Sequence, residues 1–245
     1  MSKVLIFGAT SAIATEAARA WAERGDSLFV VARDKKKLAA LAADLRARGA
    51  AQVSALVCSA EDAKAHAGLP AKAARALGGL DAALIAHGML PDEERCRRDA
   101  AYALATLQVN FNSVVSVGTP LAAFFESQRS GVLGIISSVA GDRGRASNAT
   151  YGAAKAGVSA WASGQRARLA KSGVHVATLK PGFVDSPMTA HLKKGLLFAS
   201  ARKVGRGVLA AMDKRKDTAY LPGFWKPIML AVIHMPSPIF KRLKL

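Results

Sequence analysis

The sequence predicts an α/β protein in which a doubly wound parallel sheet of about seven strands forms a single domain. Short apolar runs recur along the chain, and each is continuous rather than alternating, which is typical of strands covered on both faces. The stretches between them are rich in Ala, Leu, Arg, Lys and Glu, which favour helices. No internal repeat and no linker rich in Pro, Gly or Ser precedes residue 221.

The elements follow one another as strand and helix from the start of the chain. The expected strands are residues 4–7, 28–32, 53–57, 82–86, 132–136, 174–179 and, less clearly, 219–221. The expected helices are residues 12–24, 35–48, 60–77 and 151–171. Because strands that alternate with helices pair in parallel through right-handed crossovers, we expect one domain over residues 1–221.

Residues 222–245 form a tail of different composition. It contains four prolines, the aromatic pair Phe224 and Trp225, and a basic end at residues 241–244. The apolar run at residues 228–233 predicts a short helix that Pro236 stops. Such a tail suits a membrane interface with anionic headgroups, and equally a lid over a pocket or a contact between subunits.

Composition and charge exclude several classes of protein. Apolar residues make up 51% of the 245 residues and charged residues 21%, which excludes intrinsic disorder. Cys58 and Cys96 lie in no Cys/His cluster, so we expect no metal site. The first apolar run is too short for a signal peptide and no run approaches a membrane span, which predicts a cytoplasmic protein.

The net charge of +18 is typical of a protein with an acidic partner, but it also suits mere solubility in a basic proteome, so charge alone identifies no partner. Nucleic acid, a phosphorylated ligand, an anionic lipid surface and an acidic protein all fit this charge. No nucleic-acid-binding motif and no interleaving of basic and aromatic residues occurs, so we do not expect nucleic acid as the partner.

The turn after the first strand predicts a phosphate site. A strand that runs directly into a helix aims backbone N–H groups and the positive helix end at an anion. The expected contacts are Gly8, Thr10, Ser11, Ala12 and Ile13. The usual glycine fingerprint would have glycine at positions 12 and 14, where this chain has alanine, so the turn alone is a weak signal.

The end of the second strand indicates which nicotinamide cofactor fits. In a Rossmann-type sheet this position meets the adenosine ribose, where an acidic side chain holds the 2′-hydroxyl of NAD. Arg33 follows Ala32 there and suits a 2′-phosphate, which favours NADPH. Asp34 can reach a ribose hydroxyl, which leaves NADH open, and Arg33 has the alternative of pairing with Asp34 or Asp62.

Tyr151, Lys155 and Ser138 form the candidate catalytic group. The i, i+4 spacing of Tyr151 and Lys155 puts both on one helix face, where the ammonium is expected to lower the pKa of the phenol. Ser138 lies 13 residues before Tyr151, at the carboxyl end of a strand, where open α/β sheets bind ligands.

Gly8, Asn110, Ser138, the Tyr151 and Lys155 pair, and the turn at residues 181–186 together resemble the short-chain dehydrogenase/reductase family in order and spacing. The resemblance runs from about residue 3 to residue 221. It implies that Tyr151 donates the proton in ketone reduction, Lys155 lowers its pKa and binds the nicotinamide ribose, Ser138 orients the carbonyl and Asn110 holds a water. The further cofactor contacts that it implies are Ala86, Gly88, Tyr151, Lys155, Pro181, Gly182, Val184 and Ser186.

The chain departs from the family pattern around the cofactor. His87 stands in a turn where the family often has Asn-Ala-Gly, and Cys58 stands where an Asp often contacts adenine. We interpret His87 as a loop residue near the cofactor rather than as a second acid or base.

Residues 141–151, 188–193 and 234–243 resemble the bacterial decaprenylphosphoryl-2-keto-ribose reductases more closely. This resemblance implies reduction of a keto-sugar carried on a polyprenyl phosphate, a cell-wall precursor, at the inner face of the membrane. It also implies a flavin oxidase partner that makes the ketone. Arg143 and Arg145 are then expected to meet the phosphate as charge-assisted donors.

Two other functions remain open from the sequence. A reductase of 3-oxoacyl groups on an acidic carrier protein would share the catalytic residues and explain the charge. A non-catalytic nicotinamide-binding protein is disfavoured because Ser138, Tyr151 and Lys155 are all present. The family resemblance further implies a homo-dimer or homo-tetramer formed through the helices around Asn110 and Tyr151.

Overall fold

A seven-stranded parallel sheet runs through the computed structural model, which describes residues 1–243. In spatial order the strands are β3 (Gln52–Val57), β2 (Ser27–Ala32), β1 (Lys3–Phe7), β4 (Ala82–Ile85), β5 (Gly131–Ile136), β6 (Val174–Pro181) and β9 (Thr218–Leu221). The expected strands are therefore all present, and the doubly wound class is confirmed. The strands β1, β2, β4, β5 and β6 are almost wholly buried, whereas β3 at the edge alternates buried and exposed residues.

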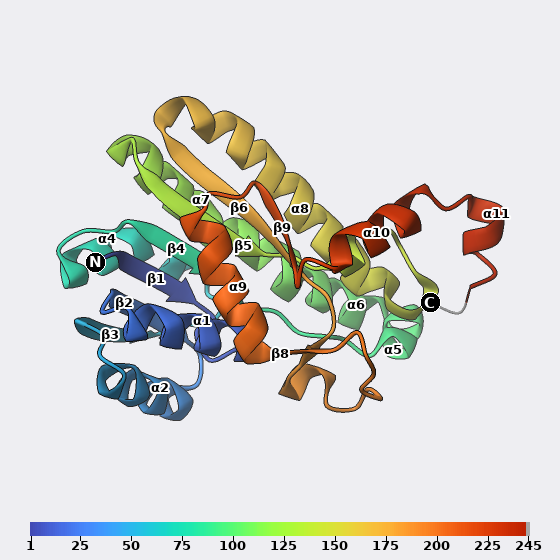
Figure 1. The fold of residues 1–245 in the computed structure, drawn as a ribbon, viewed down its shortest axis with the longest axis horizontal. Coiled ribbons are helices and arrows are strands. Elements are labelled where there is room, and N and C mark those ends of the chain that lie inside the picture. The colour runs from blue at the N-terminus through green and yellow to red at the C-terminus, as the bar shows by residue number, and fades with distance from the viewer. Residues whose placement is uncertain (244–245) are drawn as a thin grey trace.

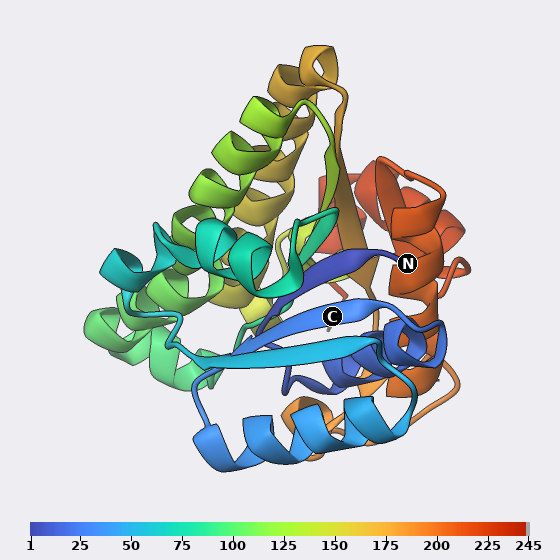
Figure 2. The ribbon, with the colours of Figure 1, turned by 90° about the vertical axis from the view of Figure 1, so that its left-hand side faces the viewer.

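Helices cover both faces of the sheet, as the side view in Figure 2 shows. One apolar core lies under α1 (Ala12–Glu23), α2 (Lys35–Ala47) and α9 (Ala201–Asp213). The other core lies under α4 (Leu69–Leu77), α7 (Ser113–Gln128) and α8 (Ala149–Leu169). This two-layer burial accounts for the continuous apolar runs in the sequence.

Local signals set the helix boundaries. Ser11 caps α1 by accepting from the Ala14 amide, and Asp34 caps α2 by accepting from the Lys37 amide at 2.9 Å. The helix expected over residues 60–77 is in fact two, α3 (Ala63–His66) and α4, because Gly68 and Pro70 interrupt it.

The helix before α7 contains a π-helical turn that the sequence did not indicate. After α5 (Glu93–Arg98) and α6 (Ala100–Leu107), the turn η1 (Gln108–Asn112) widens the helix where Asn110 lies. Single π turns of this kind are frequent at functional sites.

Strand order reverses at β1, from which the chain proceeds first to β2 and β3 and later to β4 and beyond. In open parallel sheets the crevice at the carboxyl ends of the strands, beside this switch point, binds ligands. The turn after β1, the loop after β4 and the segment after β5 all open at this edge.

The tail forms two helices that lie at one end of the molecule (Figure 1), α10 (Trp225–His234) and α11 (Ser237–Phe240). The predicted helix at 228–233 is thus part of α10, which ends before Pro236. Lys244, the last residue of the predicted basic end, and Leu245 lie outside the described residues. Within residues 1–243, no helix combines the length and the apolar character that crossing a bilayer requires.

Candidate active site

A cavity of about 770 Å³ lies at the carboxyl edge of the sheet. It extends from the β1–α1 turn, through the ends of β2 and β4, to the loop after β6. The expected site residues that line it are Gly8, Thr10, Ser11, Ala12, Ile13, Arg33, Ala86, Gly88, Ser138, Tyr151, Lys155, Pro181, Gly182, Val184 and Ser186. Of the expected site residues, Asn110 alone lies beneath this surface, fully buried.

The phosphate end of the cavity is formed by the start of α1. Gly8 adopts a φ of +78°, and a Cβ there would lie 2.6 Å from the His87 amide nitrogen, so the turn requires glycine. The Gly8 amide donates inward to Val31 O at 2.9 Å. The outward donors are instead the amides of Ala12 and Ile13 in the first turn of α1, which have no partner within a helix.

The opposite wall at the end of β2 is basic. Arg33 and Lys37 line the cavity, and within residues 1–243 Arg33 forms no ion pair. The alternative of a bridge to Asp34 or Asp62 therefore does not occur. Asp34 is absent from the lining because its carboxylate caps α2 and pairs with Lys37 at 4.0 Å.

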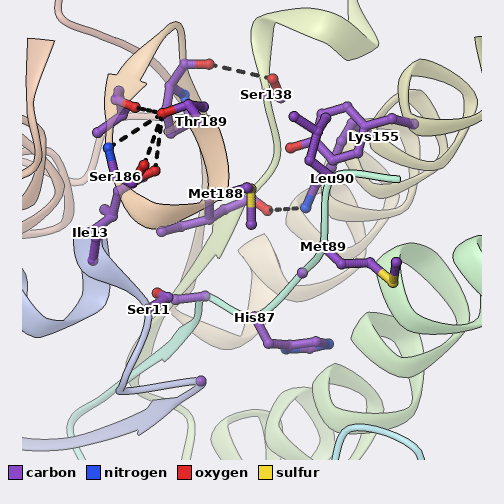
Figure 3. A pocket seen from close by; sticks show the side chains of 18 of the residues that line it. Ser11, Ile13, His87, Met89, Leu90, Ser138, Lys155, Ser186, Met188 and Thr189 are labelled. Atoms are coloured by element: carbon purple, nitrogen blue, oxygen red, sulfur yellow. Dashed lines mark hydrogen bonds between the residues drawn. The ribbon is translucent and has the colours of Figure 1, made fainter. Parts of the chain in front are cut away.

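Tyr151, Ser138 and Lys155 all line the cavity, and Ser138 and Lys155 lie across it from Ser11 and Ile13 (Figure 3). Lys155 is only 2% exposed, and its Nζ lies 5.7 Å from the centre of the Tyr151 ring and donates to Ile136 O at 3.2 Å. Ser138 accepts from the Ala140 amide at 3.1 Å, which fixes its hydroxyl at the strand end. The spacing in the sequence thus brings these three groups together.

Burial controls the protonation of this group. Although Tyr151 opens onto the cavity, the protein around its hydroxyl raises the pKa of the phenol to about 12, and Ser138 opposes this only in part. Burial lowers the pKa of Lys155 to about 8. The expected lowering of the pKa of Tyr151 does not occur here, because burial raises this pKa and the hydrogen bond with Ser138 opposes the rise only in part.

Asn110 holds the loop after β4 beside Lys155. Its Oδ1 accepts from the Met89 amide at 2.9 Å and its Nδ2 donates to Thr106 O at 3.1 Å. A Cβ on Gly88 would lie 2.9 Å from that Oδ1 and 3.5 Å from the Lys155 Nζ. Gly88 and Asn110, both expected at the site, therefore lie next to each other beside Lys155.

His87 lines the cavity, and its imidazole reaches toward Ser113 at the start of α7 (Figure 3). Its Nε2 lies 2.6 Å from the Ser113 hydroxyl, which itself donates to Val109 O. Burial, with Lys155 adding to the effect, lowers the pKa of His87 to about 3. The imidazole is neutral at physiological pH and anchors the loop, which agrees with its interpretation as a loop residue.

A side chain from α5 binds the first turn of α8, the helix that carries Tyr151 and Lys155. The Glu93 carboxylate accepts from the Thr150 amide at 3.2 Å with each oxygen, and Thr150 Oγ1 adds a third bond at 3.3 Å. Asn148, at the position that would cap α8, makes no capping hydrogen bond. Sequence reasoning missed Glu93, because its contact spans 57 residues of chain.

The loop after β6 forms the remaining wall, which is largely apolar. Thr189 Oγ1 donates to Val184 O and lies 3.3 Å from the Ser186 hydroxyl, so the loop is tied to itself (Figure 3). The apolar residues of this wall are Phe183, Met188 and Leu192. Trp225 from α10 packs on Gly182, where a Cβ would lie 2.0 Å from the indole.

Arg143 corrects one expectation. Its Nη1 donates to Val232 O at 2.6 Å, with further contacts to Ile233 O and Met235 O, and its guanidinium stacks 3.8 Å from the Phe240 ring centre. Arg143 therefore binds the tail instead of facing the cavity. The carbonyls at the end of α10 attract it because they have no partner within the helix.

The structure adds cavity residues that the sequence did not single out. They include Lys37, Glu61, Met89 and Leu90. Lys37 had a usable signal, since it lies in the first turn of a helix that begins at the same edge of the sheet. Within the described part of the chain, no cluster of three or more His, Cys, Asp or Glu forms a metal site.

A nicotinamide dinucleotide fits these residues. The cavity is lined in turn by three groups: the unpaired amides at the start of α1, the two cations Arg33 and Lys37, and Gly88, where a side chain would collide with Asn110. That order matches a pyrophosphate, an adenosine ribose and a nicotinamide ribose.

Comparison with known proteins agrees with this geometry. The family model described as short chain dehydrogenase matches residues 2–196. An uncharacterised oxidoreductase of Mycobacterium tuberculosis is 35% identical over 240 residues, which cover 98% of this chain and 96% of that protein.

Solved structures share the fold. Levodione reductase superposes with a TM-score of 0.82 at 20% identity and covers 91% of this chain and 96% of its own. A variant of actinorhodin polyketide ketoreductase with NADPH gives 0.80 at 20% identity, covering 96% and 98%. The chain therefore belongs to the short-chain dehydrogenase family of NAD(P)-dependent oxidoreductases.

Proposed function

We propose that this protein reduces a ketone to a secondary alcohol with NADPH and that Tyr151 donates the proton. The observation that carries the proposal is the meeting of Ser138, Tyr151 and Lys155 on one side of a cavity that continues to the phosphate end of α1. Bound NADPH would supply the hydride that adds to the carbonyl carbon.

The residues of the chain would handle the carbonyl oxygen. Ser138 would donate a hydrogen bond to it, and Tyr151 would give it a proton as negative charge develops. A pKa of about 12 keeps the phenol protonated at neutral pH, as a proton donor requires. The Lys155 ammonium, which is buried beside it, would stabilise the phenolate that remains.

Asn110 would act through its neighbours. It secures Met89 beside Gly88 and lies next to Lys155. We propose that Asn110 positions Gly88 and Met89 beside Lys155 and holds the water that returns a proton to Lys155.

The basic wall at the end of β2 supports NADPH over NADH. Arg33 and Lys37 both line the cavity, and the acidic side chain nearest in sequence, Asp34, is used as a helix cap. A 2′-phosphate would therefore meet two cations, whereas a 2′-hydroxyl would meet no carboxylate from this strand end.

For the substrate, we propose a keto-sugar carried on a polyprenyl phosphate. The apolar wall of the cavity and the tail beside it support a lipid-linked ligand. The exposed apolar side chains of the tail are Phe224, Leu230, Ile233, Ile239 and Leu243. The proposal includes the flavin oxidase that would make the ketone.

We further propose that residues 1–221 form the catalytic domain and that the tail at 222–245 rests on the anionic inner face of the membrane. No acidic residue occurs after Asp217, while Lys226, Lys241 and Arg242 are exposed. Aliphatic side chains beside cations suit the headgroup region of a bilayer. A homo-dimer or homo-tetramer formed through α7 and α8 belongs to the same proposal.

The alternative substrate is a 3-oxoacyl group on an acidic carrier protein, which the net charge of +18 favours equally. One assay separates the two: NADPH oxidation with a polyprenyl-phosphoryl keto-pentose is compared with oxidation by an acetoacetyl thioester. We expect the keto-pentose to be the faster substrate, and a faster thioester would favour the carrier protein.

Tyr151→Phe tests the proton donor. We expect turnover to fall at least about a hundredfold, the usual scale of general acid catalysis, with little change in the NADPH dissociation constant. NADPH fluorescence measures binding, and absorbance at the reduced nicotinamide measures turnover. A variant that keeps wild-type turnover would remove the role assigned to this phenol.

Arg33→Ala tests the cofactor. Because Arg33 would contact only the 2′-phosphate, we expect the KM for NADPH to rise about tenfold while that for NADH changes less than twofold. Asp34→Asn serves as the matched control, since it alters the adjacent side chain without changing the cation. Equal losses with both cofactors would contradict NADPH selection by Arg33.

A further inference from the structure

Arg145 lines the same cavity as Tyr151 with its hydrogen-bonding capacity unused. Its Nε is sealed from solvent and has no partner, and its Nη2 reaches only the sulfur of Met229 at 3.6 Å. Among residues 1–243, no carboxylate forms an ion pair with it. Because a buried N–H without a partner costs free energy, an acceptor that reaches this Nε would stabilise the site.

The carboxylate next to it along the loop is occupied. Asp142 is almost fully buried, and one of its oxygens binds the Lys180 ammonium while the other accepts from the Tyr220 hydroxyl at 2.8 Å. Arg145 therefore keeps its positive charge available to a ligand, since a guanidinium does not deprotonate in proteins.

Asn148 presents a second unused polar group from the same short loop. It also lines the cavity, and its side-chain oxygen is buried without a hydrogen-bond partner. A carboxamide can donate through one end and accept through the other. A ligand entering between Arg145 and Asn148 would thus meet a guanidinium and an amide.

The loop that carries both residues is fixed in place before any ligand arrives. The Arg97 guanidinium on α5 donates to Ala146 O, and the Glu93 carboxylate accepts from the Thr150 amide. Little conformational entropy remains to be lost when this loop binds a ligand, as a recognition site requires. Arg143, two residues earlier, is instead fully engaged with the tail.

We propose that Arg145, with Asn148 beside it, binds an anionic oxygen of the substrate, so that the enzyme selects ketones bearing a phosphate or carboxylate group. A guanidinium matches the geometry of such oxyanions. The inference rests on the proposed ketone reduction and adds the feature by which that substrate is chosen. The apolar wall of Phe183, Met188 and Leu192 would receive the rest of the molecule.

Calorimetric titration of the enzyme saturated with NADP⁺ tests this site, because the cofactor then occupies its own phosphate positions. Geranyl phosphate is the anionic probe and geraniol is its neutral counterpart. We expect the wild type to bind geranyl phosphate at least tenfold more tightly than geraniol, and Arg145→Met to abolish the difference without changing the Kd for geraniol. Arg145→Lys should recover part of the preference, and Arg98→Met, at an exposed arginine, should keep all of it.

A wild type without preference, an Arg145→Met variant that retains it, or an equal effect of Arg98→Met would each overturn the inference. Unchanged geraniol binding shows that the pocket of the variant is intact. If inorganic phosphate displaces geranyl phosphate, the anion alone suffices for binding, as expected for a soluble phosphorylated ketone. If inorganic phosphate does not displace it, binding also requires the apolar chain, as expected for a lipid-linked substrate. The titration requires no turnover, so failure of the proposed reduction would appear separately, as no NADPH oxidation with any ketone.

Discussion

Lys155 is the residue whose environment most directly limits the chemistry. It lies 2% exposed with a backbone carbonyl as its hydrogen-bond acceptor, and burial lowers its pKa to about 8. The side chain of Lys155 is therefore mostly protonated and positively charged only below about pH 8. Tyr151, with a pKa of about 12, stays protonated across the same range.

The pH dependence of the reaction should therefore follow Lys155. We expect kcat/KM for NADPH, which reports the ligand-free enzyme, to be level from pH 6 to about pH 8 and then to fall about tenfold per pH unit. The measurement is initial rates across pH 6–10 at a fixed ketone concentration. A profile that stays level to pH 10 would show that the charge of Lys155 is not required.

Stability should change over the same range with a defined sign. Because the pKa of Lys155 is lower in the folded protein than in the unfolded chain, the unfolded chain binds more protons between pH 8 and 10.5. The contribution of Lys155 to the unfolding free energy therefore rises with pH in that window, by up to about 1.4 kcal/mol per unit. Denaturant unfolding of Lys155→Met against the wild type at pH 7 and pH 10 measures this difference, and a pH-independent difference would contradict it.

At the scale of elements, α8 depends on α5 for its N-terminal partner. The amide of Thr150, one residue before Tyr151, donates to Glu93 rather than to Asn148 at the capping position. A carboxylate at a helix start satisfies unpaired amides and favours the helix dipole. The position of the Tyr151 phenol is thus linked to a side chain 58 residues earlier in the chain.

Glu93→Ala should lower kcat several-fold and unfolding stability by about 1 kcal/mol, the usual cost of a lost cap, with little change in KM. Glu93→Gln, which keeps an oxygen acceptor, should recover most of kcat. Glu126→Ala is the matched control, since Glu126 pairs with Arg168 near the far end of α8. If the alanine and glutamine variants lose kcat equally, Glu93 does not act by holding this helix end.

The sequence predicts those features of the fold that depend on residues close together in the chain. Periodicity locates the strands and α8 because each follows from residues near in sequence, and strand ends locate Ser138 and Gly8 because parallel strands end at one edge. The Glu93 contact and the hydrogen bonds of Arg143 to the tail join residues distant in sequence, and no sequence pattern indicated the π turn at Asn110. Burial also reversed the expected shift in the pKa of Tyr151, since desolvation depends on the assembled fold.

At the scale of the molecule, the tail packs on the segment that follows β5 and reaches from there to the surface. Trp225 and Met229 pack against Val139, next to Ser138, while Arg143 holds the end of α10. The opposite side of the tail is exposed, apolar and basic. Contact with a membrane would therefore place the cavity, and Arg145 within it, beside the lipid surface.

Charge reversal separates a membrane-binding tail from the general effect of a net charge of +18. The double variant Lys241→Glu/Arg242→Glu lowers the net charge of the exposed tail by four units. The control, Lys214→Glu/Lys216→Glu, lowers the net charge by the same four units in the exposed turn between α9 and β9, at the amino ends of the strands. Because charges act on a bilayer mainly within a Debye length of about 8 Å, only the tail variant should lose binding, by several-fold. Co-sedimentation with vesicles of anionic and of neutral lipid measures this at physiological salt. Equal losses in the two variants would mean that the whole charge, and not the tail, attracts the bilayer, and the tail would then act only in closing the cavity.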